Sequence, residues 1–386
     1  MVVTQFNSPL TLIVGGGARK RLAEQILKRG KNRVLLVTDA HMVSSGKVQE
    51  LENQLYAAGI HVSIFSNVQP DPTVDNVEQG LAAYRNSQSE MIVGFGGGSP
   101  MDAAKAISIL TSNPLPLSQY MGYHKVANAG CPLILVPTTA GTGSEATKVS
   151  VITDTVRNIK MMMLDEHLQA DVAIVDYELS VSMPKTLTAH VGIDTFSHGL
   201  EAFVSRKASP LTDPIALACL QLWRKHLVDA YANGNDIVAR EGMMIAALHG
   251  GMAFSNSSVC LIHGMSRPLG AHFHLTHGLS NAVLLPEVTK SSLAAAEARY
   301  AEVARRLQIA SSQETDCVAA NALVPWLENL NRTCGIPRMR VLISDQKAYE
   351  NKFHSMAQAA IESGSPANNP RVPSSEQIID IYRAIW

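Results

Sequence analysis

Strand-like and helix-like segments are unevenly distributed along this chain of 386 residues, and their distribution constrains the fold more than any other feature. Up to about residue 180, short apolar runs rich in β-branched residues alternate with helical patterns. Strands that are apolar throughout and separated by helices indicate a parallel sheet covered on both faces. The predicted strands span residues 11–14, 33–38, 61–65, 91–95, 133–136, 149–152 and 172–175, and the predicted helices among them span residues 18–29, 45–58, 74–86 and 100–110.

From about residue 187 the strand patterns stop and helical patterns follow. The helices predicted in this half span residues 189–204, 213–232, 236–254, 293–307, 318–334, 346–363 and 375–386. We therefore predict an α/β domain with a parallel sheet over residues 1–183 and an all-α domain over residues 184–386, joined near Pro184.

The overall charge excludes several classes of partner. The chain has 32 Lys and Arg residues against 33 Asp and Glu residues, a formal net charge of −1, which predicts no basic surface for nucleic acid. Its longest apolar runs fall short of the ~18–20 residues that a membrane span needs, and its first residues do not resemble a secretory signal. The five cysteines are an odd number without a CxxC pair, which favours free thiols in the cytoplasm over a disulfide framework.

A glycine-rich turn follows the predicted strand at residues 91–95. Gly96, Gly97 and Gly98 let the backbone approach a ligand closely, and Ser99 is suited to cap a helix whose first turn contains Pro100. Free N–H groups and the helix dipole at such a terminus bind phosphate. The pattern is not a full GxGxxG motif, because serine occupies the last position, so a purely structural turn is an alternative.

Two other predicted strands also end in polar residues. Asp39 ends the strand in VLLVTDA, where an acidic side chain either accepts hydrogen bonds from an adenosine ribose or caps the next helix. It precedes the glycines in the chain, whereas the acid of the usual dinucleotide fingerprint follows them, so the standard Rossmann order does not apply. The second strand end, VPTTAGTGSE at residues 136–145, concentrates hydroxyl and glycine residues and predicts a polar binding loop.

A metal site is predicted in the second half. Asp194 and His198 are four residues apart and share one face of a helix, so both side chains can reach a single cation. Farther on, one segment contains His263, His272, His274 and His277. One carboxylate with imidazoles suits Fe(II), Zn(II), Co or Ni better than Mg or Ca, which prefer oxygen ligands. Spacing alone does not select the ligands within the cluster, and any single histidine is equally consistent with a hydrogen-bonded core residue.

These blocks, in this order, resemble the iron-containing (group III) alcohol dehydrogenase family. The matching segments extend from about residue 10 to the C-terminus and read GGGSPMDAAKA, PTTAGTGSEAT, DVAIVDYEL, GIDTFSHGLEAFVS, GMAFSN, HGMSRPLGA, HGLSNAVLLP and NNPR. The resemblance implies an N-terminal nucleotide-binding α/β domain followed by an all-helical metal-binding domain. It also implies NAD as cofactor, with NADP as an alternative, and Fe(II) as the metal, with Zn or Ni as substitutes.

Carried over position by position, the resemblance implies the residues of three sites. The implied metal ligands are Asp194, His198, His263 and His277. The implied cofactor-binding residues are Asp39 and Asp71 near the adenosine, Gly97, Gly98 and Ser99 at the pyrophosphate, and Thr138, Thr139, Thr142, Lys160 and Leu187 toward the nicotinamide. The implied substrate-pocket residues are Val149 and Phe254.

The chain departs from the family pattern at one position. Many members have a histidine four residues after the first ligand of the cluster, where this chain has Arg267 in HGMSRPLG. Arginine cannot take up a proton, so His272, His274 or water would have to relay protons instead. A buried arginine also needs a partner, which is Glu201, the cofactor phosphates or an anionic substrate. The expected catalytic residues are His263, His277, Arg267 and His274.

We therefore expect a metal-dependent, NAD(P)-linked alcohol dehydrogenase or aldehyde reductase. Hydride would pass between nicotinamide C4 and a small primary alcohol or aldehyde bound to Fe(II). The alternatives are a glycerol-dehydrogenase-like polyol oxidoreductase, a dehydroquinate synthase, a reductase of an anionic semialdehyde that uses Arg267, and a non-catalytic sensor. Family members are often dimers or larger, so we expect a cytoplasmic homodimer or larger homo-oligomer without nucleic-acid or membrane partners.

Overall fold

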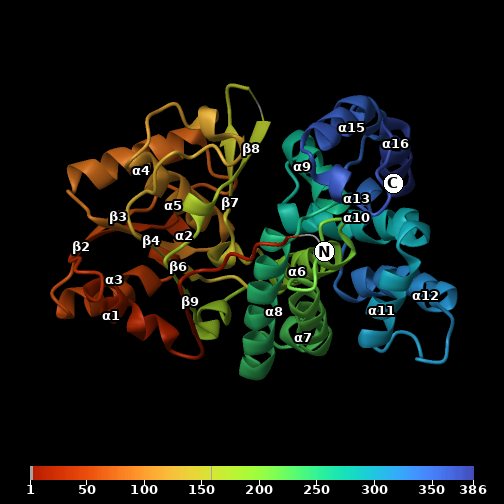
Figure 1. Cartoon of the computed structure of the whole chain (residues 1–386), viewed down its shortest axis with the longest axis horizontal. Coiled ribbons are helices and arrows are strands. Elements are labelled where there is room, and N and C mark those ends of the chain that lie inside the picture. The colour runs from red at the N-terminus through yellow and green to blue at the C-terminus, as the bar shows by residue number, and fades with distance from the viewer. Residues whose placement is uncertain (1–2, 158) are drawn as a thin grey trace. The chain divides into compact units, whose positions relative to one another are not determined.

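The computed structural model describes residues 3–157 and 159–386 (Figure 1). The chain folds as two compact units. One comprises Asn7–Val181, and the other comprises Ser182–Trp386 together with residues 3–6.

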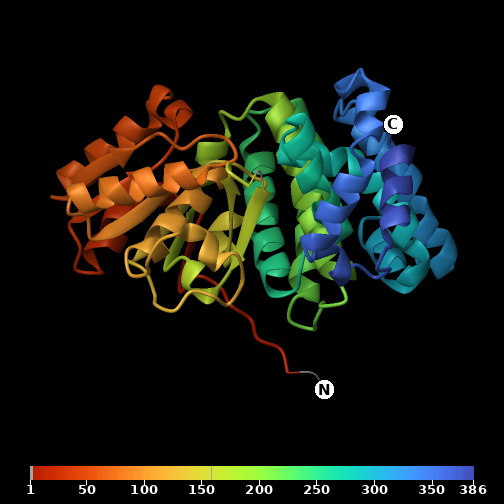
Figure 2. The same ribbon diagram turned by 90° about the horizontal axis from the view of Figure 1, so that it is seen from above.

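The Asn7–Val181 unit is built on a parallel sheet of six strands within the described residues, in the order β1-β9-β6-β4-β2-β3 (Figure 1 and Figure 2). The strands are β1 (Thr11–Val14), β2 (Arg33–Val37), β3 (His61–Phe65), β4 (Met91–Gly96), β6 (Leu133–Pro137) and β9 (Val172–Val175). This confirms the predicted parallel α/β architecture. Because β2, β4 and β6 are parallel neighbours, the loops that follow them lie along one edge of the sheet.

Helices cover both faces of this sheet, and side chains alternate between the faces along each strand. On β2, Leu35 and Val37 pack with α4 (Val74–Asn86) and α5 (Gly98–Leu110), whereas Val34 and Leu36 pack with α1 (Leu22–Leu27) and α3 (Lys47–Ala57). Burial on both faces explains why these strands are apolar throughout. Shorter helical segments are η1 (Ala18–Arg21), α2 (Ala40–Ser44), η2 (Leu117–Tyr120), η3 (Ser144–Ala146), η4 (Glu166–Leu168) and η5 (Tyr177–Ser180).

The predicted strand at residues 149–152 does not belong to the main sheet, which corrects the sequence prediction. It is part of β7 (Val149–Asp154), which pairs antiparallel with β8 (Ile159–Leu164) in a second sheet whose third strand is β5 (Gly122–Tyr123). Burial alternates along β7, as expected for a strand with one covered face. Strand β8 was not predicted, because its KMMML segment lacks the β-branched residues that marked the other strands.

The second unit is helical throughout its described residues from Ser182 onward, as predicted. Its helices are α6 (Lys185–Val204), α7 (Asp213–Ala232), α8 (Ile237–Asn256), α9 (Leu261–Phe273), α10 (His277–Ser292), α11 (Glu297–Arg306), α12 (Asp316–Thr333), α13 (Met339–Leu342), α14 (Gln346–Glu350), α15 (Phe353–Glu362) and α16 (Ser375–Ala384), with 3-10 turns η6 (Leu293–Ala295) and η7 (Ser365–Asn368). Among the described residues, no single helix is long and apolar enough to cross a membrane, and only α8 and α9 together, bent by 104° at their junction, pass that test.

Two of these helices, α9 and α10, were not predicted. Both contain an internal proline, Pro268 in α9 and Pro286 in α10, and histidines and glycines interrupt the apolar pattern of α9. The single helix predicted over residues 346–363 is divided into α14 and α15, and the one predicted over 293–307 begins with η6. The segments that carry His263 and His277 are therefore those with the weakest helix signal.

Small residues allow close packing around α6. Gly192 lies so close to α7 that a Cβ there would come within 2.3 Å of Leu227 Cδ1, and Trp223 Nε1 donates to Gly192 O at 2.5 Å. On α8, a Cβ at Gly250 would come within 3.3 Å of His198 Cβ. This close packing holds α6, and the polar side chains it carries, in a fixed position within the helical unit.

Candidate metal centre and cofactor loops

The α6 helix carries three polar side chains on one side. Asp194, His198 and Glu201 are separated by four and then three residues, which places them along one face. All three are almost completely buried. Buried charges need partners, and the Asp194 and Glu201 carboxylates find them on α9 and α10.

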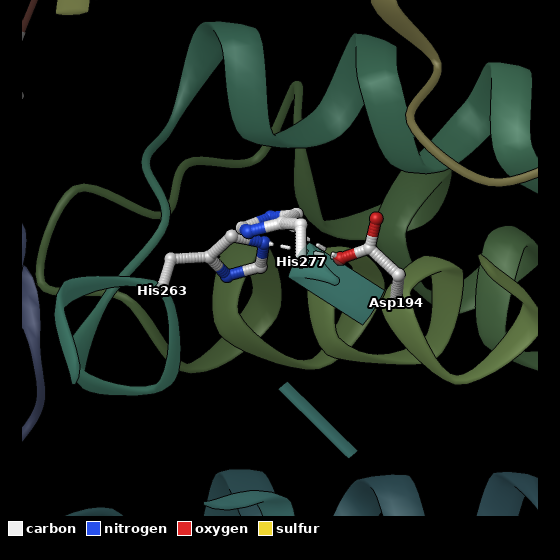
Figure 3. A group of neighbouring side chains, drawn as sticks. All are labelled: Asp194, His263 and His277. Carbon is white, nitrogen blue, oxygen red and sulfur yellow. Dashed lines mark ion pairs between the residues drawn. The ribbon is translucent and has the colours of Figure 1, made fainter. Parts of the chain in front are cut away.

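His263 of α9 and His277 of α10 approach the Asp194 carboxylate (Figure 3). Asp194 Oδ1 lies 3.4 Å from Nε2 of His263 and 3.6 Å from Nε2 of His277, and one ligand atom from each of the three residues lies within 4.8 Å of the others. His198 Nε2 lies 3.8 Å from the same oxygen. The four side chains predicted as metal ligands therefore lie together.

The histidines surround an anionic carboxylate. Burial alone would raise the pKa of Asp194, but His198, His277 and His263 outweigh it and hold the pKa well below its usual range. The His198 ring stacks on His263 with 4.7 Å between ring centroids, and Phe254 of α8 stacks on His198 at 4.4 Å. Phe254, predicted to line the substrate pocket, therefore packs directly on the metal centre.

Glu201 determines which nitrogen of His263 faces Asp194. His263 Nδ1 lies 2.6 Å from Glu201 Oε2, and because an ionised carboxylate only accepts, Nδ1 carries the proton and Nε2 faces Asp194. Burial alone would lower the pKa of His263, but Glu201 and Asp194 raise it to about 9. The surroundings of Nε2 therefore favour a positive charge at that nitrogen, whether a proton or a metal cation.

Asn281, one turn after His277 on α10, reveals an excess of acceptors. Its Nδ2 lies 2.6 Å from Asp194 Oδ1 and 3.2 Å from Nε2 of both His263 and His277. When Nε2 of both histidines is unprotonated, as metal binding requires, the two N–H groups of this amide face three acceptors. Its own Oδ1 is buried without a hydrogen-bond partner among the described residues. A cation among these acceptors would remove the mismatch, and a carboxylate with imidazoles suits Fe(II) or Zn(II).

Other predicted catalytic residues have different surroundings. The His277 side chain is 37% exposed, whereas those of Asp194, His198 and His263 are at most 5% exposed, so His277 marks the accessible side of the centre. Arg267 is half-buried on α9, and its Nη1 donates to Ser365 Oγ at 3.2 Å. In the described part of the chain, neither His272 nor His274 belongs to the group of ligand atoms around Asp194, and His274 is exposed at the end of α9.

In the other unit, the glycine-rich turn forms the start of α5, which begins two residues earlier than predicted. Gly97 is the N-cap residue and Gly98 begins the helix, so Ser99 lies in the first turn and does not cap it. The helix begins early because the backbone around Gly98 packs closely on the next loop: a Cβ there would lie 2.9 Å from Thr142 Cγ2. The N–H groups of Gly98 and Ser99 lack acceptors within the helix, which suits them to an anion.

The loop after β6 packs directly on this turn. Thr138 N donates to Gly96 O at 2.9 Å, and a Cβ at Gly97 would lie 3.4 Å from Thr139 Cγ2. The structure therefore brings together the predicted pyrophosphate residues with Thr138, Thr139 and Thr142.

The other residues predicted to bind cofactor or substrate lie on several different elements, in both units. Asp71 and Lys160 form an ion pair with Oδ1 and Nζ 2.6 Å apart. Asp39 follows β2 and caps α2, since its Oδ1 accepts from Met42 N at 2.8 Å. Val149 begins β7, whereas Leu187 lies on α6 in the helical unit.

A buried lysine that was not among the predicted site residues packs against the segment after the threonine loop. Lys105 of α5 is fully buried. Its Nζ lies within hydrogen-bond distance of four acceptors: Ser144 O at 2.6 Å, Ser144 Oγ and Thr147 Oγ1 at 2.9 Å, and Val149 O at 2.8 Å. One ammonium group therefore connects α5 to the whole segment that follows the threonine loop.

A carboxylate completes this network. Asp102, one turn before Lys105, accepts from Ser144 Oγ at 2.7 Å and from Val151 N at 3.0 Å. Burial lowers the pKa of Lys105 to about 8, although Asp102 and Glu145 oppose the decrease. An aspartate and a lysine three residues apart in the otherwise apolar helix of GGGSPMDAAKA were the available sequence signal.

Comparison with known proteins extends over almost the whole chain. The profile of the family described as iron-containing alcohol dehydrogenase matches residues 9–177, and that of the C-terminal part of the Fe-containing alcohol dehydrogenase family matches residues 188–386. The chain is 36% identical over 381 residues to an NAD-dependent methanol dehydrogenase from Bacillus methanolicus, with 99% of both chains covered.

Solved structures agree with this match. The fold resembles a crystal structure of 1,3-propanediol oxidoreductase with a TM-score of 0.96 and 34% identity, covering 100% of both chains. It also resembles sulfoacetaldehyde reductase from Bifidobacterium kashiwanohense in complex with NAD+, with a TM-score of 0.88, 27% identity and coverage of 100% of this chain and 99% of that chain.

Proposed function

Because this chain belongs to the iron-containing alcohol dehydrogenase family, we propose that it interconverts a small primary alcohol and the corresponding aldehyde with NAD(H). The observation that carries the proposal is the convergence of Asp194, His263 and His277 at ligand distance in a chain matched along nearly its whole length. The excess of acceptors around Asn281 supports a cation at that point.

The proposal assigns a task to each group of side chains. Asp194, His198, His263 and His277 would hold the cation, and the first turn of α5 would bind the pyrophosphate through Gly98 and Ser99. When bound, the cation supplies a Lewis acid for the substrate oxygen and the nicotinamide supplies or accepts the hydride.

The residues around the centre would control the access of substrate and the exchange of protons with solvent. His277, the most exposed of the four ligands, borders the side from which substrate arrives, and Phe254 provides an apolar wall on His198. Arg267 stays protonated, so we assign proton exchange with solvent to His274, which is exposed at the end of α9.

We propose Fe(II) as the metal in the cell, with Zn or Ni as substitutes in purified protein. The donor set of one carboxylate and three imidazoles accepts all three metals, and intrinsic affinity does not favour iron. We also propose a preference for NAD(H) over NADP(H), because the Asp39 carboxylate at the end of β2 would repel a 2′-phosphate.

The direct test is spectrophotometry of NADH oxidation with a panel of small aldehydes, and of NAD+ reduction with the matching alcohols and glycerol. We expect turnover of primary aldehydes that depends on added divalent metal. Tight NADH binding without turnover of any carbonyl would indicate a sensor instead. Preferential oxidation of glycerol would indicate a polyol oxidoreductase.

A second candidate function is reduction of an aldehyde that carries an anionic group. Arg267 places a permanent cation on α9, the helix that carries His263, and a guanidinium can bind carboxylates or sulfonates in bidentate fashion. The similarity to a sulfoacetaldehyde reductase favours this candidate. The hydrogen bond from Arg267 to Ser365 favours a structural role for the arginine, so we place this candidate second.

We further propose a cytoplasmic homodimer or larger homo-oligomer. All five cysteines are free, as suits a reducing compartment. The edge strand β1 and the residue before it expose apolar side chains, with Leu10 82% and Val14 46% exposed, and an exposed apolar edge favours pairing with another chain. Light scattering after size-exclusion chromatography would give the mass of the assembly.

A further inference from the structure

We propose that Glu201 is a positioning residue for the metal centre, which holds His263 in the orientation and tautomer that a cation requires. The proposal rests on the metal site of the proposed function. It adds a residue that neither the sequence motifs nor the similarity to known proteins assigns to that site.

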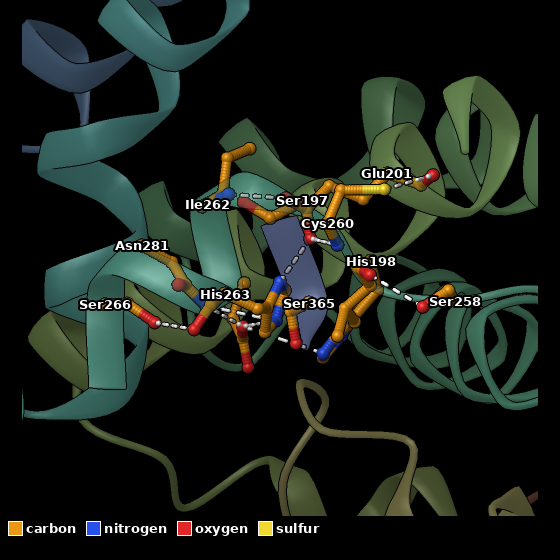
Figure 4. A network of polar contacts seen from close by, with 12 residues as sticks. Ser197, His198, Glu201, Ser258, Cys260, Ile262, His263, Ser266, Asn281 and Ser365 are labelled. Carbon is orange, nitrogen blue, oxygen red and sulfur yellow. Dashed lines mark hydrogen bonds and ion pairs between the residues drawn. The ribbon is translucent and has the colours of Figure 1, made fainter. Parts of the chain in front are cut away.

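The Glu201 carboxylate is fully engaged by the start of α9 (Figure 4). Its Oε1 accepts from Ile262 N at 2.6 Å, and its Oε2 accepts from Cys260 N at 2.8 Å and from His263 Nδ1 at 2.6 Å. Glu201 and His263 are both almost completely buried. Charge-assisted hydrogen bonds in such surroundings are short and strongly directional.

These contacts fix one ligand relative to two others. Asp194 and His198 lie on the same helix as Glu201, so α6 supplies two ligands and also binds the residue that bears the third. Cys260, the N-cap residue of α9, makes no capping hydrogen bond with its own side chain, and Glu201 accepts from the N–H groups there instead. The position of His263 therefore depends directly on the Glu201 carboxylate.

The same contact fixes the chemistry of the imidazole. With the proton held on Nδ1, the Nε2 lone pair is directed toward Asp194, 3.4 Å away. A carboxylate on the far nitrogen of a metal-binding histidine also makes the near nitrogen a stronger donor, and removal of such a partner typically costs about 10- to 100-fold in metal affinity. Glu201 should therefore control how tightly the centre retains its metal.

The competing explanation is that Glu201 only stabilises the first turn of α9. Asp165, in the Asn7–Val181 unit, provides a matched control because it makes the same kinds of contact. It accepts from the backbone N–H groups of Val126 and His167 at 2.9 and 3.0 Å, and its Oδ1 lies 2.8 Å from Nδ1 of His167. Loss of Asp165 removes an equivalent carboxylate from an imidazole that is not a predicted ligand.

The experiment titrates Co(II) into full-length, chelator-treated wild type, Glu201→Gln and Asp165→Asn, in competition with a coloured chelator. Glutamine keeps the length of the side chain but turns one acceptor oxygen into a donor that faces N–H groups. We expect Glu201→Gln to weaken Co(II) binding by about 10- to 100-fold and to change the visible Co(II) spectrum. We expect Asp165→Asn to lower thermal stability while leaving the affinity and the spectrum unchanged.

Wild-type Co(II) affinity and spectrum in Glu201→Gln would overturn the proposal and leave Glu201 as a helix cap. If that variant does not fold, 15N-histidine NMR of the Zn(II)-loaded wild type decides, with His263 assigned by its absence in His263→Asn. A proton on Nδ1 and metal on Nε2 support the proposal, and the reverse arrangement overturns it. Failure of the wild type to bind any metal would instead refute the proposed function, so the two failures are distinguishable.

Discussion

The two units of this protein bury charge in opposite ways. In the helical unit, Asp194 and the Nε2 atoms of His263 and His277 converge as acceptors on the single amide group of Asn281. In the α/β unit, Lys105 presents a buried ammonium to four acceptors and lies near the Asp102 carboxylate. With its imidazoles neutral, the first cluster has no cation to offset Asp194, whereas the second contains a cation as part of the chain. We infer that the first is built to receive an external cation and the second to hold loops in place.

The largest expected effect follows from removing a ligand in the helical unit. His277→Ala should release the metal and lower kcat by about a thousandfold or more, because a Lewis acid contributes several kcal/mol to carbonyl chemistry. His277 is the most exposed of the four predicted ligands, so the fold should survive. Elemental analysis measures the metal content and steady-state kinetics measure kcat. An NADH fluorescence titration checks that the fold survives. Full activity in metal-free protein would show that the cluster is not the catalytic centre.

The corresponding change in the α/β unit should affect stability first. Lys105→Met removes the buried cation near Asp102 and leaves the acceptors of the 144–149 segment without their donor, a loss that we expect to cost about 3–5 kcal/mol. Urea unfolding followed by circular dichroism measures the change. Lys28→Met, at an exposed position in the same unit, is the control and should change stability by less than about 0.5 kcal/mol.

If Lys105→Met keeps wild-type stability but loses metal, Lys105 does not serve mainly to hold the loops in place, and the difference between the two units is smaller than we infer. The contrast becomes sharper if that variant loses NADH affinity while its metal content stays unchanged, because the ammonium would then act through the loop that carries Thr138, Thr139 and Thr142.

A smaller effect is expected at the end of β2. Asp39→Gly should shift the ratio of kcat/KM values for NADPH and NADH toward NADPH by about 10- to 100-fold, the equivalent of about 1.5–3 kcal/mol for a hydrogen bond to a charged group. Asp39 also caps α2 through Met42 N, so Asp39→Asn separates the two roles. Asparagine keeps the cap and removes the charge. A wild type that already prefers NADPH would exclude Asp39 as the discriminating residue.

The sequence predicted the parallel sheet well because burial on both faces makes each strand apolar throughout, as in VLLV of β2 and VAIV of β9. It predicted the metal centre less completely. Asp194 and His198 share a helix and their spacing is visible in the sequence, but α9 and α10 were missed because each contains an internal proline, and histidines and glycines interrupt the apolar pattern of α9. Without those helices, spacing could not select among the four histidines of the segment.

Glu201 and Asn281 show a second limit of sequence reasoning. Each follows a predicted ligand at helical spacing, Glu201 three residues after His198 and Asn281 four residues after His277. Their partners come from other helices, up to 87 residues away for the pair Asn281 and Asp194. Local spacing shows that two side chains share a face, but only tertiary packing shows what that face meets. Sequence reasoning offered Glu201 as one partner for Arg267, whereas the contacts of its carboxylate with the N–H groups at the start of α9 follow only from the packing of α6 on α9.

The smallest expected effect concerns Arg267. Its Nη1 donates to Ser365 Oγ, which ties α9 to the turn at Ser365–Asn368. If this is its main role, Arg267→Met should lower kcat/KM for succinic semialdehyde and for butanal by the same factor, and their ratio should change by less than about threefold, within about 0.7 kcal/mol. If the guanidinium instead binds the carboxylate, kcat/KM should fall only for succinic semialdehyde, by the equivalent of about 1.5–3 kcal/mol. A selective loss of that size would replace the structural role with anion recognition and make the anionic aldehyde the preferred substrate class. An equal loss for both substrates would confine Arg267 to supporting α9, and thereby the position of His263.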